Sequence, residues 1–410
     1  MVTAATTHRP NSSDPVVVIG GGVHGTYVAR ELLESGLPRG QLVILDSNGR
    51  LLESFRRKAR GCGMETLRSN YVQHVGPSPF GLELFARARN REDELVATHN
   101  SQCRPTLSLF LDYADSVIQQ FELDTLLTEA TVTGIERADG LRIKTIDESI
   151  RARRAIIAVG HAGRYCRPEW SRSTDRLEHV WDSAEPPAER INPGENVVVV
   201  GGGITACQTA LALADCANTV ALWSGHPLRK ALREADPRWL NWKHIERELH
   251  THPPGSKARV ERIAQARNDG KVPPYLLREL RASAVTITTD RIQDLHEFDT
   301  GLSLVGEQTR QHDVDRVLLA TGFESVATHP FVDRVAQSLS LSRGYDGWPV
   351  LDDETLSWQT VDGSSSDLYV TGKLAELTVG PLAGNIPGAR RASERLVAAA
   401  RQQQLLAASP

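Results

Sequence analysis

The sequence has little cysteine, no long hydrophobic run and no large excess of charge of either sign. Its five cysteines are an odd number in a chain of 410 residues and show no paired spacing, which predicts reduced thiols in a cytoplasmic protein. No run reaches ~18 apolar residues, so no transmembrane helix is predicted. The net charge of -4 provides no cationic field for nucleic acid or anionic lipid. We therefore expect neither a membrane nor a nucleic-acid partner.

Several catalytic signatures are also missing. The 13 histidines are scattered without the spacing of metal ligands, and no G-x-S-x-G motif indicates a hydrolase. A flavin-linked disulfide reductase needs two cysteines close together, but Cys207 and Cys216 lie on opposite faces of one predicted helix. These patterns predict no metal site and argue against thiol chemistry.

The chain does have two glycine-rich loops, the first in "VVVIGGGVHG" at 16–25. Its apolar, β-branched run predicts a buried parallel strand, and Gly20, Gly22 and Gly25 follow with G-x-G-x-x-G spacing. Such glycines allow a tight turn, close approach to a pyrophosphate and close packing of the next helix on the strand. The next predicted strand ends at Asp46, where a carboxylate can accept both hydroxyls of a ribose. The pattern predicts a dinucleotide site without a 2'-phosphate.

The second loop, "VVVVGGGITA" at 197–206, repeats the device with a difference. Gly201, Gly203 and Ala206 form G-x-G-x-x-A, but the following strand ends at Ser224 without an acidic residue. Arg229 and Lys230 follow shortly after, and cations there favour a ribose 2'-phosphate, hence NADPH over NADH. The simpler alternative, that both cations only begin a solvated helix, stays open.

The order of these motifs predicts the α/β class, with two dinucleotide-binding, Rossmann-like domains. Three later strands are expected to end in glycine, at Gly160, Gly322 and Gly372. The first domain is expected to comprise residues 15–190 and 320–410, after a disordered tail at 1–14. The second domain, 191–319, would be inserted in the first and would carry a helical insertion at about 228–283.

Over nearly its whole length the sequence resembles the class B flavin-dependent monooxygenases, and within them the lysine/ornithine N-hydroxylase-like FAD/NAD(P)-binding proteins. The motifs behind this resemblance are the loops at 20–25 and 201–206, "GMETLRSNYVQHVGPSP" at 63–79, "RPTLSLFLDYADSV" at 104–117, "LATGF" at 319–323 and "LAELTVGPLAGNIPGARRA" at 374–392. His179 and Trp181 lie near the position of a family fingerprint, without its leading phenylalanine.

The resemblance implies FAD in the first domain and NADPH in the second. Reduced FAD would react with O2 to a C4a-hydroperoxide, which would N-hydroxylate a small amine or amino-acid-like substrate. A flavoprotein without oxygenation is the alternative: an NADPH oxidase, a reductase or a redox sensor. The oligomeric state and the substrate's identity are left open.

The candidate site residues follow from the motifs. The candidate catalytic residues are Arg68, His74 and Asn385, and His74 could relay a proton or serve only as a hydrogen-bonded structural residue. The expected FAD contacts are Gly20, Gly22, His24, Gly25, Asp46, Gln73, Val132, Gly160, Gly372, Asn385 and Ile386. The expected NADPH contacts are Gly201, Gly203, Ala206, Ser224, Arg229, Lys230, Thr321 and Gly322.

Overall fold

The buried run at 16–19 forms the central strand β1 of a six-stranded sheet in the computed structural model, which describes residues 14–98, 101–268, 270–403 and 405–406. All neighbouring strands of this sheet are parallel except the last pair. In spatial order the strands are β5 (Leu127–Glu129), β2 (Leu42–Asp46), β1 (Val16–Ile19), β9 (Arg154–Ile157), β21 (Ser365–Val370) and β20 (Ser357–Gln359). Residues 1–13 of the expected tail lie outside the described residues.

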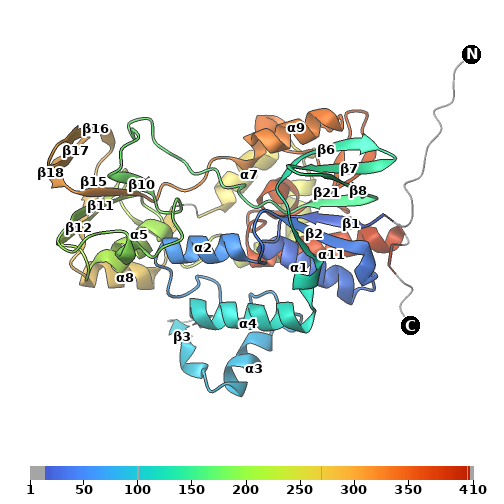
Figure 1. The fold of residues 1–410 in the computed structure, drawn as a ribbon, viewed down its shortest axis with the longest axis horizontal. Helices are drawn as coiled ribbons and strands as arrows, with labels where there is room; N and C mark the ends of the chain where they lie inside the picture. Colours follow the sequence, from blue (N-terminus) through green and yellow to red (C-terminus); the bar gives the residue numbers. More distant parts are fainter. Residues whose placement is uncertain (1–13, 99–100, 269, 404, 407–410) are drawn as a thin grey trace, which may run out of the picture.

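A second sheet, entirely parallel, lies on the left in Figure 1 and repeats the same plan. In spatial order its strands are β15 (Thr286–Thr289), β12 (Thr219–Ser224), β11 (Asn196–Val200), β19 (Arg316–Leu319) and β10 (Leu177–His179). Because β10 pairs with β19, the expected domain boundary at 190/191 comes too late in the chain. The second unit takes this strand from the segment assigned to the first.

Each unit also carries a three-stranded antiparallel sheet at the same point of its topology, just before the fourth parallel strand. These sheets are β6 (Val132–Ala138), β7 (Gly140–Thr145) and β8 (Ser149–Ala152), and β16 (Ile292–Phe298), β17 (Gly301–Gly306) and β18 (Arg310–Val314). The chain therefore contains one architectural unit twice, and the predicted fold class is confirmed.

Helices cover the sheets where the sequence places apolar faces. Helices α1 (Val23–Glu34) and α11 (Ile386–Gln402) pack together on the first sheet, and α5 (Ile204–Leu213) and α8 (Pro274–Ala282) on the second. Helix α2 (Glu53–Gly61) lies between the units (Figure 1), where the backbone oxygen of Lys58 accepts a hydrogen bond from Trp181 Nε1 at 3.2 Å. The remaining elements near the first unit are α3 (Gly81–Ala88), β3 (Leu95–Thr98), β4 (Ser101–Pro105), α4 (Leu107–Gln120), α9 (Pro330–Ser338) and α10 (Glu376–Val379).

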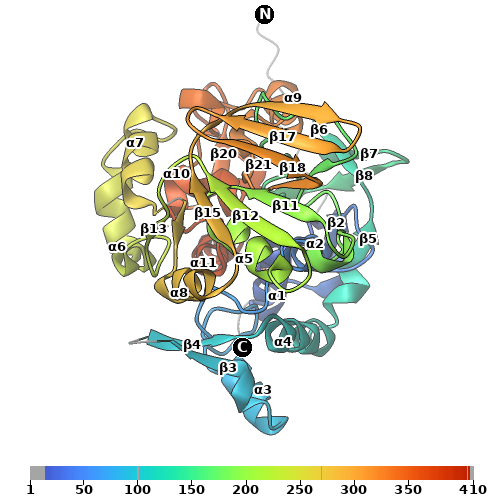
Figure 2. The ribbon, with the colours of Figure 1, turned by 90° about the vertical axis from the view of Figure 1, so that its left-hand side faces the viewer.

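The expected helical insertion divides between the two units. Its middle part, residues 231–268, is called the inserted segment below and contains α6 (Trp242–Ile245) and α7 (Lys257–Ala266). It packs Trp239 and Ile263 into the core of the first unit. Its helices α6 and α7 lie on the left in Figure 2. Helix α8, in contrast, belongs to the core of the second unit. The expected range 228–283 is therefore too wide, and two-residue strands β13 (Arg229–Lys230) and β14 (Lys271–Val272) close the inserted segment.

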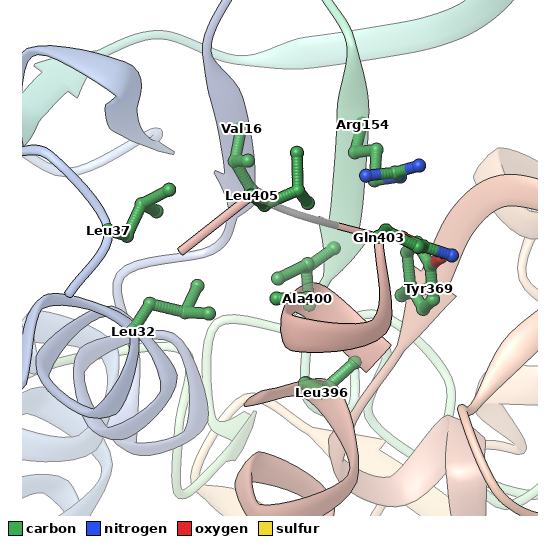
Figure 3. A pocket seen from close by; sticks show the side chains of 10 residues that line it. Val16, Leu32, Leu37, Arg154, Tyr369, Leu396, Ala400, Gln403 and Leu405 are labelled. Atoms are coloured by element: carbon green, nitrogen blue, oxygen red, sulfur yellow. The ribbon is translucent and has the colours of Figure 1, made fainter. Parts of the chain in front are cut away.

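A small apolar pocket lies at the opposite end of the first sheet from the glycine loop. It forms where Leu396, Ala400 and Leu405 approach Val16 at the start of β1 (Figure 3). Its volume of about 20 Å³ is room for a single water. Ligands of open parallel sheets bind beyond the carboxyl ends of the strands, so this pocket is part of the packing rather than a substrate site.

The first glycine loop generates a stability prediction. A Cβ atom on Gly25 would lie 1.8 Å from the backbone oxygen of Gly20, whereas a Cβ atom on Gly22 would meet nothing within 4 Å. We expect Gly25→Ala to lower the free energy of unfolding by about 1–3 kcal/mol or more, and Gly22→Ala to leave it nearly unchanged. Thermal unfolding followed by circular dichroism measures both. Equal melting temperatures for the two variants would contradict the close helix–strand contact.

Candidate functional site

The first glycine loop forms a cradle at the amino end of α1. Gly20 has φ +111° and donates its N–H to the backbone oxygen of Leu45 at 2.7 Å, which turns the chain sharply out of β1. Gly22 is the N-cap of the helix and has no side chain to cap the first N–H groups. The space beside its Cα atom is open. Free N–H groups at the start of a helix form a ready anion site, so this loop fits a pyrophosphate.

Asp46 stands at the end of β2, directly beside the cradle. Its Oδ2 accepts the N–H of Gly21 at 2.5 Å, and its Oδ1 accepts the N–H of Asn48 at 2.8 Å. Oδ1 also accepts Asn48 Nδ2 at 2.7 Å. A carboxylate has about four acceptor positions, so Oδ2 can still accept a ribose hydroxyl. Glu129 of β5 is paired with Asp46 of β2. Val132 begins β6 just after Glu129 in the chain.

The other expected FAD contacts meet at the same edge of the sheet. His24 Nδ1 lies 3.1 Å from Thr371 Oγ1, and the ring packs under Gly372. Burial lowers the pKa of His24 to about 4, against a smaller opposing effect of the backbone of Gly384 and Asn385. Its Nε2 atom is buried without a partner. A buried, neutral ring nitrogen without a partner is a group that a bound cofactor would satisfy.

The second glycine loop has the same geometry with small differences. Gly201 has φ +151° and donates its N–H to Trp223, and the space beside Gly203 is open. Ser224 is fully buried at the end of β12, where Asp46 stands in the first unit, and donates its hydroxyl to the backbone of His226 at 2.7 Å. At this end of the second sheet a phosphate cradle is therefore followed by a serine where the first unit has an aspartate.

The two expected cations do not act together in the structure. Arg229 and Lys230 are neighbours on β13, and successive side chains of a strand point to opposite sides. Lys230 lines an open pocket of about 500 Å³ together with Arg278 and Arg281 of α8, and Arg229 is not part of it. Sequence reasoning missed the two arginines, because only the packing of α8 brings them beside β13.

Arg68, Gln73 and Asn385 line one pocket of about 220 Å³, called the central pocket below. Arg68 donates to the backbone oxygens of Ala231 and Leu232 at 3.3 and 3.4 Å, and so holds the inserted segment as the facing wall. The other lining residues are Ser69, Asn70, Thr98, Arg104, Leu232, Arg233, Glu234, Ala235, Pro237, Leu240, Leu382 and Pro387. Those from the inserted segment were missed from the sequence.

His74 lies outside the central pocket, and both of its ring nitrogens are hydrogen-bonded to backbone groups. Its Nδ1 accepts the N–H of Gly76 at 3.1 Å, so the neutral ring carries its proton on Nε2, which lies 3.2 Å from the backbone oxygen of Pro79. Burial lowers the pKa of His74 to about 4. With both ring nitrogens engaged, the structural alternative for His74 is the one that the geometry favours over the proton relay.

The segments that connect the two units, residues 158–176, 180–195 and 320–329, are called the linkers below. Stacked rings hold them together. Tyr165 stacks on His179 with 4.7 Å between ring centroids, and Phe323 stacks on Trp181 at 4.3 Å and on His161 at 4.0 Å. Burial lowers the pKa of His179 to about 4 and that of His161 to about 3. Both rings are neutral near pH 7, so His179 and Trp181 pack the linkers in this structure.

Thr321 and Gly322 belong to the same linkers. Thr321 donates its hydroxyl to the backbone of Cys166 at 2.5 Å, and Gly322 has φ +88° with open space beside it. Both residues lie just beyond the carboxyl end of β19, which is the neighbour of β11 in the second sheet. Gly160, with φ +61° and open space, holds the corresponding place after β9.

Two of the five thiols, Cys62 and Cys207, are unsuited to redox chemistry. All five cysteines are free, and Cys62 and Cys207 are buried. Burial raises the pKa of Cys62 to about 11 and that of Cys207 to about 12, so neither is a thiolate at neutral pH. Within the described ranges, no group of three or more potential ligands could hold a metal ion, and no helix is long and apolar enough to cross a membrane.

Comparison with known proteins supports the fold. The family described as pyridine nucleotide-disulphide oxidoreductase matches residues 16–353. No curated protein matches the chain.

Solved structures are similar over nearly the whole chain at low sequence identity. The ornithine N-hydroxylase of Kutzneria sp. 744, in a structure with reduced FAD, NADP+ and L-ornithine, is 15% identical with a TM-score of 0.75, over 96% of this chain and 100% of that one. The L-lysine 6-monooxygenase of Pseudomonas syringae is 16% identical with a TM-score of 0.71, over 95% and 99%. The bacillithiol disulfide reductase of Staphylococcus aureus is 14% identical with a TM-score of 0.63, over 95% and 99%. The resemblance seen in the motifs is thus confirmed as a likeness of fold.

The environment of His74 predicts a pH dependence of stability. Its pKa is about 4 in the folded protein and about 6.5 when unfolded, so the unfolded chain takes up the proton first. The contribution is complete above about pH 6.5 and is lost as the pH falls towards 4. We expect the melting temperature of His74→Gln to fall less steeply than that of the wild type between pH 6.5 and 4.5. The exposed His296→Gln is the matched control, and equal slopes in all three proteins would contradict the assignment.

Proposed function

This chain belongs to the pyridine nucleotide-disulphide oxidoreductase family, and from that premise we propose that it is an FAD- and NADPH-dependent monooxygenase. Its substrate is a small amine or amino-acid-like molecule, which it N-hydroxylates with O2. The observation that carries the proposal is the central pocket, in which Arg68, Gln73 and Asn385 from two of the motif segments meet at the carboxyl edge of the first sheet.

FAD is held by the first unit. The open cradle at Gly22 would take the pyrophosphate, Oδ2 of Asp46 would accept a ribose hydroxyl, and the unpartnered Nε2 of His24 would face a polar group of the cofactor. When bound, FAD supplies the two-electron chemistry between NADPH and O2. The protein contributes the position of the ring and a site from which water is excluded.

The start of α11 is the part of the chain best suited to the flavin ring. The helix has 17 residues, and Asn385 at its N-cap makes no side-chain capping bond. Pro387 has no N–H, so the N–H groups of Ile386 and Gly388 are the ones that can stabilise negative charge. Asn385 lines the central pocket and is the residue that we expect to touch both ring and substrate.

NADPH is held by the second unit. The cradle at Gly203 takes its pyrophosphate, and Thr321 and Gly322 lie where the linkers lead back to the first unit. A serine in place of an acid at the end of β12 favours a 2'-phosphate, and the pocket lined by Lys230, Arg278 and Arg281 is where we assign it.

The substrate class rests on the wall of the central pocket and on the likeness to the ornithine and lysine hydroxylases. The pocket combines arginine and amide groups with an apolar wall, as a site for a short, polar-ended molecule would. Disulfide reduction, the other chemistry among the similar folds, is disfavoured because the thiols of Cys62 and Cys207 are buried and protonated.

The choice of nucleotide gives the first functional prediction. Lys230→Ala and Arg278→Ala should each raise the KM for NADPH about ten- to a hundredfold, since a bond to a charged group contributes about 1.5–3 kcal/mol. The KM for NADH should stay within about twofold. Arg229→Ala, which leaves the pocket intact, should have the smaller effect. Steady-state oxidation of both nucleotides measures this, and equal use of NADH and NADPH by the wild type would refute the 2'-phosphate assignment.

The reaction itself is tested by product analysis. Purified protein should carry the visible absorbance of FAD, oxidise NADPH in air, and convert an amine such as L-ornithine or L-lysine to its hydroxylamine. Gly22→Asp is the control, because its carboxylate would occupy the pyrophosphate cradle and repel the cofactor. A wild type without flavin would rule out the FAD assignment. Stoichiometric hydrogen peroxide with every amine tried would leave the oxidase or reductase alternative.

A further inference from the structure

Glu234 brings a carboxylate from the inserted segment into the wall of the central pocket. Its Oε1 accepts a hydrogen bond from Arg267 Nη2 at 2.8 Å, and its Oε2 accepts one from Asn385 Nδ2 at 2.8 Å. Its backbone oxygen accepts the N–H of Asn268 at 2.7 Å. The side chain is therefore held from two sides, and each carboxylate oxygen already has a donor.

Asn385 is oriented by this contact. An asparagine at an N-cap ordinarily accepts a bond from an N–H of its own helix, but Asn385 makes no such bond although its backbone is extended. A carboxylate only accepts hydrogen bonds, so the amide must turn its Nδ2 towards Glu234. Its Oδ1 is thereby placed at the opposite edge of the amide group from Nδ2. The direction of Asn385 thus depends on a residue about 150 positions earlier in the chain.

Arg267 extends the contact to the first unit. Its Nη1 donates to Glu376 at 2.5 Å, and Glu376, only 3% exposed, also accepts Lys373 Nζ at 2.6 Å. Glu234, Arg267, Glu376 and Lys373 form what we call the charge bridge, with two anions and two cations. A buried carboxylate is tolerable when its charge is matched and its oxygens are bonded, which is the case here.

We propose that Glu234 is a positioning residue: it sets the orientation of Asn385 at the flavin-facing end of the central pocket and couples the inserted segment to that site. The inference rests on the proposed function, in which Asn385 touches FAD. The charge bridge keeps Glu234 in place.

The test is a double-mutant cycle on flavin reduction, which needs neither O2 nor a substrate. FAD-loaded Glu234→Ala, Asn385→Ala and the double variant are mixed anaerobically with saturating NADPH, and the visible spectrum of the bound flavin is recorded before mixing. Both single variants should slow reduction by about tenfold and shift the spectrum in the same direction. The double variant should be no slower than Asn385→Ala, because residues that act through one another are not additive.

Three further variants separate positioning from packing. Glu234→Gln should stay within about threefold of the wild type, since its amide oxygen can still accept from Asn385. Glu234→Asp keeps the charge, but its side chain is one methylene too short to reach Asn385, so it should behave as Asn385→Ala. It also replaces Glu234→Ala in the test if that variant does not fold. Glu261→Ala, an exposed residue of the same inserted segment, is the control and should match the wild type.

Several results would overturn the inference. Additive losses in the double variant, or wild-type reduction by Glu234→Asp, would show that Glu234 does not act through Asn385. Wild-type reduction and spectrum in Asn385→Ala would refute it as well, and intact substrate hydroxylation in that variant would leave the proposed function standing. If the double-mutant cycle gave the expected non-additive losses but the wild type hydroxylated no amine, only the proposed function would be refuted.

Discussion

Close contact between a helix and a strand governs both nucleotide-binding units. In the first unit, Gly25 of α1 lies against the backbone oxygen of Gly20, a contact that excludes any side chain. In the second unit, Ala206 stands in the same place, and its Cβ atom lies 3.1 Å from the point that a Cβ atom added to Gly201 would occupy. Each contact aims the start of a helix at the carboxyl edge of its sheet. The open cradles, the buried residue at the end of the second strand and the linkers beyond the fourth strand are all arranged around that edge.

The inserted segment is what distinguishes this chain from a plain pair of such units. It leaves the second unit after β13, packs Trp239 and Ile263 into the core of the first, and returns at β14. Its apolar face covers α10, where Arg259 donates to the backbone oxygen of Leu377 at 3.1 Å. By this crossing it supplies one wall of the central pocket, so the pocket is lined by residues of the first unit and of the inserted segment.

Prediction from the sequence succeeded where the signal is local. A β-branched run, glycine spacing and an acid at the end of the next strand lie within about thirty residues, and β1, the turn at Gly20 and the start of α1 lie where this pattern predicts them. The FAD contacts of Gly20, Gly22 and Asp46 stay predictions. Prediction was less accurate where a residue's role depends on its neighbours in space. His74 is engaged by the backbone of Gly76, and β10 joins a sheet whose next strand along the chain begins only at Asn196.

The sequence alone determined the two Rossmann-like units and their order, because parallel strands, tight turns and helix starts are encoded in short stretches of residue type and spacing. It also predicts no metal site and no thiol chemistry, since the residues needed for them lack the spacing. Only the tertiary structure decided which charges meet. The hydrogen bonds of Glu234 with Arg267 and Asn385, and the pocket that Lys230 and Arg278 line together, join segments between which no periodicity connects the residues. Such contacts arise from how helices pack, which depends on the whole set of buried surfaces rather than on any one stretch.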